Sequence, residues 1–268
     1  MIKTSTQKKL VKSELREIFH FRHLITTFAI MDLKLRYRHS LLGVAWSFLE
    51  PLLILTILNV VFGTILKNNI ENFPIFLILS LTMFNMFTRG TTMSIESILG
   101  RSPIIKSAYM KREIFPLSSN ITAFLMMCIE FSIVIAFLIF FRFVPTYTVL
   151  IIPYFLIILF VFTLGMSLPL SILNVRFRDV RIIWTVITQA LFFLTPIFYK
   201  IDFLPKQIAE LVRLNPMALL IEMSHNALLY GKLPTAYELA YTTTTSVLVL
   251  IVGWMIFRKL NHTIDEVI

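Results

Sequence analysis

The sequence has little of the polar surface that a water-soluble protein needs. Of its 268 residues 15% are charged and 57% are hydrophobic, and the mean hydropathy is +0.81. Soluble domains carry about 45–50% apolar residues, so this chain cannot cover a soluble globule with polar groups. The single cysteine, Cys128, lies in an apolar run, and one cysteine excludes an intrachain disulfide. The composition therefore predicts an integral membrane protein.

Glycine and histidine are also scarce, which argues against enzyme chemistry. None of the seven glycines has GxxxxGK[ST] or GxGxxG spacing, so no nucleotide site is recognisable. His20 and His23 lie one helical turn apart on a basic segment that suits headgroup contact better than a metal ion. Ser224 and His225 lack the GxSxG context of a hydrolase. The chain is predicted to be no enzyme and to hold no metal or cofactor itself.

The net charge of +10 indicates topology rather than nucleic-acid binding, because the basic residues are not gathered in one patch. Residues 31–53 organise the chain. Lys34, Arg36 and Arg38 stand before the first long apolar run, and cations in that position stay on the cytoplasmic side. The inner segments of a six-span arrangement hold 18 Lys and Arg, and the outer segments hold six. Both termini are therefore predicted to be cytoplasmic.

The predicted fold is all-α, with six transmembrane helices and two further features. Apolar residues at helical spacing between residues 21 and 35 predict an amphipathic helix in the cytoplasmic interface, or a soluble helix packed on a partner. Residues 199–238 are too rich in proline for one crossing and too apolar for a free loop, so short re-entrant helices are expected on the outer side. Residues 1–40 then form a basic tail and interface helix, and residues 41–268 form the transmembrane domain. The spans are expected near residues 41–66, 73–98, 117–141, 149–173, 182–198 and 239–257, the fifth being short for a crossing.

Glu50, Arg89 and Glu130 are ionisable residues inside these spans, where such groups usually face the bundle interior or a water path. At about 1.5 Å per residue, Glu50 is about 13 Å from the cytoplasmic end of its span and Arg89 is about 6 Å from that side. The length of an arginine side chain makes them a plausible pair, either as structural contact or as part of a gate. Glu130 lies about 20 Å from the cytoplasmic end. It does not match Arg89 in depth, so a pore-facing role is expected. Pro51, beside Glu50, predicts an irregular local structure.

Several motifs resemble the ABC-2-type permeases that export polysaccharides, in the expected order along the chain. The resemblance rests on RYR at residues 36–38 with Ser40, Gly43, Trp46 and PLL at 51–53, RSPIIKSAYMKREIFPLS at 101–118, Asn174 with FRDV at 177–180, LTPIFY at 194–199, LP at 204–205 and NPM at 215–217.

The resemblance implies a homodimer in the inner or plasma membrane of a bacterium, with two copies of an ATP-binding subunit that hold ATP and Mg. Membrane lipids surround it, and its expected substrate is a lipid-linked polysaccharide such as an O-antigen, a capsule or a teichoic acid. Two short cytoplasmic loops combine charge with apolar residues, which suits docking on a soluble partner. The residues expected to couple to the ATPase are Lys106, Arg112, Glu113, Arg178 and Asp179, and the gate or channel candidates are Trp46, Glu50, Arg89 and Glu130. Two alternatives stay open, an ABC-2 exporter of a lipid or drug and a multispan enzyme acting on lipid-linked sugars.

Overall fold

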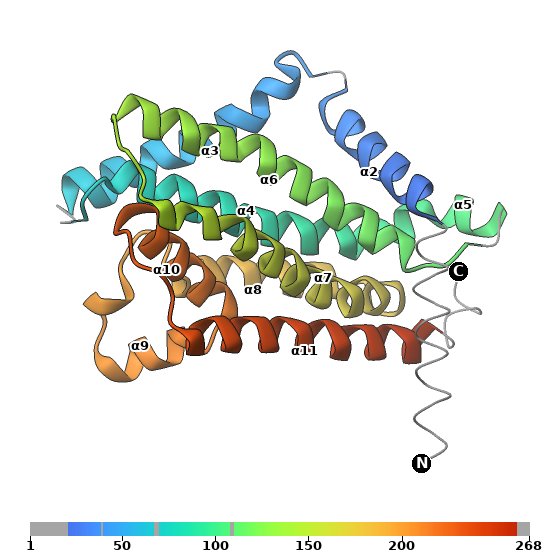
Figure 1. The fold of residues 1–268 in the computed structure, drawn as a ribbon. Helices are drawn as coiled ribbons and strands as arrows, with labels where there is room; N and C mark the ends of the chain where they lie inside the picture. Colours follow the sequence, from blue (N-terminus) through green and yellow to red (C-terminus); the bar gives the residue numbers. More distant parts are fainter. Residues whose placement is uncertain (1–20, 39, 67–69, 108–109, 262–268) are drawn as a thin grey trace.

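A computed structural model describes residues 21–38, 40–66, 70–107 and 110–261 of the chain, which form helices and loops without a strand among them (Figure 1). Residues 1–20 of the predicted basic tail lie outside the described residues. The helices are α2 (Arg22–Tyr37), α3 (Trp46–Leu58), α4 (Phe73–Ser97), α5 (Ser102–Ser107), α6 (Ile114–Phe140), α7 (Ile152–Arg176), α8 (Val180–Leu194), α9 (Lys206–Arg213), α10 (Pro216–Leu229) and α11 (Ala236–Asn261). Short helical turns are η1 (Gly43–Ala45), η3 (Leu99–Arg101), η4 (Tyr147–Ile151) and η5 (Ile201–Phe203), and η2 (Asn59–Ile65) is a π-helical segment.

Five of the described helices are long and apolar enough to cross a membrane, and α8 is a shorter apolar helix. The long ones are Trp46–Ile65, Phe73–Ser97, Ile114–Phe140, Tyr147–Arg176 and Ala236–Asn261. With 15 residues, α8 is about 22 Å long, which is short of the roughly 30 Å hydrocarbon core. The prediction that the fifth hydrophobic stretch is short is confirmed.

The long helices run side by side, with α5 and the end of α11 at one end of the bundle and α9 and α10 at the other (Figure 1). We call these the α5 end and the α10 end. The short helices predicted for residues 199–238 are present as α9 and α10. Asn215 caps α10 by accepting a hydrogen bond from the Met217 amide at 3.1 Å, and Pro216 occupies the first helical position.

The centre of the bundle is α4, which contacts α3, α6, α7, α8 and α10. Its candidate span is 78% buried within the chain, against 11% for Trp46–Ile65 and 17% for α11. Helices α7 and α11 cross closely at Gly165 and Gly253, where a Cβ on either glycine would overlap the backbone of the other helix. Small residues allow this approach between membrane helices.

Helix α2 packs against α6 of its own chain at the α5 end (Figure 1). Ile25, Phe28 and Ala29 are buried there, and Thr122 donates a hydrogen bond to the Ala29 carbonyl at 3.2 Å. The side chains of Met31 and Leu35, which the predicted apolar stripe included, are 39% and 50% exposed because only the first half of α2 is covered. The helix is therefore amphipathic but docked on the bundle.

Pro51 does not interrupt α3, which runs unbroken from Trp46 to Leu58. The expectation of an irregular structure beside Glu50 is wrong at that point. Proline removes one backbone donor and restricts the residue before it, and here the helix accommodates both. The irregular backbone lies instead at η1, before α3, and at the π-helical segment η2 after it.

Candidate functional site

Arg89 of α4 lies between two carboxylates from different helices. Its guanidinium donates to Glu130 of α6 in a short contact, and to Glu50 of α3 at 3.3 Å. Arg36 of α2 lies 3.8 Å from the same Glu50 carboxylate. We call Arg36, Glu50, Arg89 and Glu130 the charge cluster. It connects the four elements α2, α3, α4 and α6.

The charge cluster has two largely buried members and two members that are more than a third exposed. The Glu130 side chain is 0% exposed and that of Arg89 is 13% exposed, whereas those of Glu50 and Arg36 are 46% and 38% exposed. A buried carboxylate needs a cation and hydrogen bonds to remain charged. Arg89 supplies the cation and a hydrogen bond to one Glu130 oxygen, while the other oxygen has no hydrogen-bond partner among the described residues. Arg89 with Glu130 is therefore the fixed part of the cluster, and Glu50 is its accessible part.

The predicted pairing of Glu50 with Arg89 is present, but the separation of Glu130 from Arg89 is wrong. The depth estimate measured positions along the helix axes and ignored side-chain direction. Side chains on an α-helix lean toward the helix N-terminus. Because α4 and α6 run antiparallel, Arg89 leans toward the α10 end while Glu130 leans toward the α5 end, so their charged groups meet. Glu130 is fully buried within the chain, and its role at a gate or channel stays a prediction.

Trp46 stands one helical turn before Glu50, on the same face of α3. Residues four apart are neighbours on a helix surface. The Trp46 side chain is 44% exposed, close to the value for Glu50. This face of α3 therefore presents an aromatic ring and a carboxylate outward from the chain.

A groove of about 650 Å³ opens at the α5 end between α5 and the connection from α7 to α8. Lys106 and Arg178, two residues predicted to couple to an ATPase, both line it together with Arg181. Arg181 is held by an ion pair with Glu96 at 2.7 Å, and Asn174 donates to the Ile95 carbonyl at 2.9 Å. The groove thus has an excess of cations.

The other predicted coupling residues lie beside the groove or away from it. Asp179 is exposed at the residue before α8, where a carboxylate is favourable to the helix dipole. Arg112 donates to the carbonyl and side-chain oxygens of Asn261 at 3.2 and 3.0 Å, which fastens the start of α6 to the end of α11. Glu113 is half-buried immediately before α6. The structure therefore brings Lys106 and Arg178 together and places Arg112 and Glu113 at a helix junction.

Sequence reasoning missed one contact at this end that involves Arg101 of η3. Its guanidinium donates to Asp32 of α2 at 2.6 Å and lies over the rings of Phe28 and Phe115, 5.1 and 5.7 Å from their centroids. Asp32 is the one acid among residues 22–37, and this isolated charge was the sequence signal for the contact. The contact fixes α2 to the segment that leads into the groove.

Comparison with known proteins decides the family. The ABC-2 type transporter family model matches residues 23–229, which is more than half of the chain. The chain belongs to the ABC-2 type transporter family. The match runs from α2 through α10 and so includes both the charge cluster and the groove.

Named relatives of this ABC-2 chain align along almost its whole length. It is 30% identical to an O-antigen export system permease protein RfbA of Klebsiella pneumoniae, over 91% of this chain and 95% of the relative. The identity is 28% to RfbA of Myxococcus xanthus, over 94% and 97%. It is 22% to the polysialic acid transport protein KpsM of Escherichia coli, over 85% and 90%.

Proposed function

We propose that this chain is the permease subunit of an exporter that moves a lipid-linked polysaccharide from the cytoplasmic to the outer face of a bacterial inner membrane. The observation that carries the proposal is the alignment, over 91% of the chain, with a protein named as an O-antigen export permease. The alignment with a polysialic acid transport protein supports a polysaccharide rather than one particular glycan. The five long apolar helices supply the membrane path.

ATP hydrolysis comes from a separate subunit, of which two copies serve a homodimer of this chain, and that subunit holds ATP and Mg. The groove at the α5 end supports this assignment, because Lys106, Arg178 and Arg181 offer cations at the edge of the bundle. The Lys and Arg distribution predicts that this end is cytoplasmic, as an ATPase contact requires. The low burial of Trp46–Ile65 and of α11 leaves apolar faces for lipid and for a second copy.

Coupling through the connection between α7 and α8 provides the test. Arg178 and Asp179 are exposed, and α8 begins at the next residue, so this connection cannot absorb movement as a flexible linker would. Reversing both charges, with Arg178→Asp and Asp179→Arg, keeps the net charge. It should leave the folded chain intact, because both side chains are exposed and a charge at a helix N-terminus contributes about 0.3–1 kcal/mol. In vesicles that contain the ATPase and a lipid-linked glycan, export should fall while ATP hydrolysis continues.

The control exchanges two exposed charges at the α10 end, with Lys206→Glu and Glu210→Lys, which should change neither rate. Normal export and hydrolysis in the Arg178 and Asp179 variant would make the connection a passive turn. The permease alone, without the ATPase, should hydrolyse no ATP. Robust turnover by the purified chain would overturn its assignment as a subunit that depends on a separate ATPase.

A further inference from the structure

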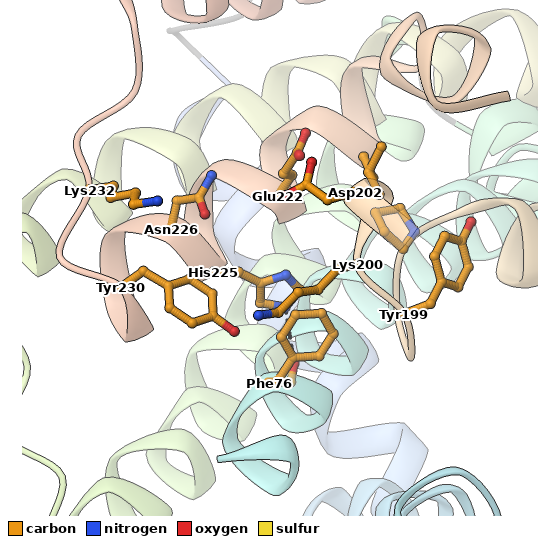
Figure 2. A pocket seen from close by; sticks show the side chains of 11 residues that line it. Phe76, Tyr199, Lys200, Asp202, Glu222, His225, Asn226, Tyr230 and Lys232 are labelled. Carbon is orange, nitrogen blue, oxygen red and sulfur yellow. Dashed lines mark hydrogen bonds between the residues drawn. The ribbon is translucent and has the colours of Figure 1, made fainter. Parts of the chain in front are cut away.

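A second polar cavity lies at the α10 end, far from the groove and the charge cluster. It is enclosed by α10, by the segment that follows α8 and by the first turn of α4 (Figure 2). Its volume is about 130 Å³. The export function proposed above assigns it no role.

The floor of this cavity is a fixed, uncharged imidazole. The His225 ring is stacked on the Phe76 ring with centroids 3.5 Å apart, and its Nε2 lies 2.7 Å from the Ser80 hydroxyl and 3.1 Å from the Phe76 carbonyl. Both oxygens belong to α4, so these contacts join α10 to the central helix. Burial keeps this histidine neutral, and it therefore contributes rigidity rather than charge.

Two lysines at this cavity lack an acid partner in the part of the chain that the structure describes. Lys200 and Lys232 both line it, and neither lies within ion-pair distance of a carboxylate among the described residues. The Lys200 ammonium lies over the Tyr230 ring, 4.3 Å from its centroid. Figure 2 shows Lys200 beside His225 and Tyr230, and Lys232 beside Asn226.

The two acids on the lining share one arginine. Arg213 of α9 donates to Asp202 at 3.1 Å and to Glu222 at 2.9 Å. Arg213 balances one of the two carboxylates, so the two lysines leave a single excess positive charge at the cavity. An anion entering the cavity would meet two ammonium groups that form no ion pair with these acids, at a site whose net charge is positive.

Tyr230 adds an orphaned donor. Its hydroxyl is buried and has no hydrogen-bond partner among the described residues. Buried polar groups are nearly always satisfied, so such a hydroxyl indicates a missing ligand or water. The turn after α10 sets the position of these donors, because Gly231 takes φ +61° and the Lys232 amide returns to the Asn226 carbonyl at 2.9 Å.

The donors and the volume together define the ligand. Ammonium, hydroxyl and amide groups match a ligand whose oxygens only accept hydrogen bonds. A volume of 130 Å³ is below the roughly 300–1,000 Å³ of pockets for drug-sized molecules and equals about four waters. We propose that this cavity binds a phosphate group through Lys200, Lys232 and Tyr230. The source of the phosphate is either a lipid headgroup or a soluble phosphate.

The neighbouring helix favours a lipid headgroup as the source. Along α9 and the residue after it stand Ile208, Leu211 and Leu214, whose side chains are 47%, 67% and 62% exposed. The same helix supplies Arg213, which ties it to the cavity wall. An exposed apolar face beside a cationic pocket suits a helix that lies in the membrane interface.

Isothermal titration of the purified full-length permease in neutral detergent tests the proposal, with inorganic phosphate and dioctanoyl phosphatidic acid as probes. Charge-assisted hydrogen bonds are stronger than neutral ones, so Lys200→Gln and Lys232→Gln should each weaken binding by about tenfold or more. The matched control is Lys206→Gln, an exposed lysine on α9 outside the cavity, which should bind as the wild type does. Dioctanoylglycerol, which lacks the phosphate, should not bind.

The pattern across probes identifies the source. Binding of both probes, each weakened by the cavity variants, supports a general phosphate site, and binding of the phosphatidic acid alone supports a lipid headgroup. No binding at millimolar probe would overturn the proposal. So would equal weakening by Lys206→Gln, or equal binding of dioctanoylglycerol.

Tyr230→Phe keeps the test independent of folding. Because the hydroxyl has no partner among the described residues, its removal should leave the thermal unfolding temperature unchanged or raise it, while weakening phosphate binding several-fold. Unchanged phosphate affinity in this folded variant would show that the hydroxyl serves water alone and would remove it from the site.

Discussion

The charge cluster makes a prediction about which of its members holds the bundle together. Replacing Arg89 with glutamine leaves the fully buried Glu130 carboxylate without a cation. Breaking a buried pair in this way costs about 3–5 kcal/mol. Glu50→Gln removes a partner that is 46% exposed and 3.3 Å from Arg89, and the expected cost is about 0–1 kcal/mol. The structure thus predicts a large difference between two variants at the same cluster.

A double variant separates pairing from simple loss of size. Arg89→Gln combined with Glu130→Gln removes both buried charges and leaves two amides of similar volume. Its cost should be well below the sum of the two single variants, because neither charge is then left alone. The measurement is the free energy of unfolding of each purified variant in the same detergent, followed by tryptophan fluorescence.

Exchanging the charges of two residues tests which carboxylate is the stabilising partner of Arg89. Arg89→Glu with Glu130→Arg should recover part of the lost stability, because a buried pair of opposite charge is restored. Arg89→Glu with Glu50→Arg should not recover it, since the carboxylate introduced at position 89 would then lie beside the buried Glu130 carboxylate. The reasoning is refuted if Glu50→Gln costs as much as Arg89→Gln, or if the costs of Arg89→Gln and Glu130→Gln simply add.

Two further predictions concern packing and pH. Gly253→Ala should lower the free energy of unfolding by about 1–3 kcal/mol, because its Cβ would overlap the Gly165 carbonyl of α7, whereas Gly100→Ala, with nothing within 4 Å of its Cβ, should be neutral in the same assay. Burial lowers the pKa of His225 to about 3, so between pH 6.5 and about 3 the unfolded chain binds a proton that the folded chain does not. As the pH falls through that range, stability should decrease by about 1.4 kcal/mol per pH unit, relative to a His225→Gln control measured in parallel, and equal pH profiles would contradict it.

The spans could be predicted from sequence because hydropathy and the Lys and Arg distribution both report on the membrane. The third was expected at residues 117–141 and is Ile114–Phe140, and the fourth at 149–173 and is Tyr147–Arg176. The last was expected to begin at residue 239, three residues late. Thr235 and Glu238 form a reciprocal capping box, with bonds of 2.7 and 3.2 Å, and this T-x-x-E signal marks the true start.

The candidate sites were less predictable because they depend on side-chain direction and on contacts between distant segments. Depth measured along the helix axes put Glu130 too far from Arg89 for an ion pair. Because α4 and α6 are antiparallel, the two side chains lean toward each other, and their charged groups meet. Nothing in the spacing of Lys200 and Tyr230 indicates that one lies over the other, since the turn at Gly231 and the packing of α10 on α4 decide it. The helices could therefore be predicted from local sequence patterns, whereas the sites depend on tertiary packing.

Burial also indicates where this bundle can move at least cost. Local opening requires little free energy where few apolar contacts are buried. By that measure α4 is fixed, with 78% of its span buried, while the span Trp46–Ile65 is loosely attached at 11%. The contacts of Glu50 with Arg89 and Arg36, at 3.3 and 3.8 Å, join this loosely attached span to the fixed centre. Because Glu130 holds Arg89 whether or not Glu50 is present, α3 can separate from the cluster without leaving a buried charge unpaired. An arginine with two carboxylates of unequal burial thus keeps a partner at the centre of the bundle when its contact with α3 is absent.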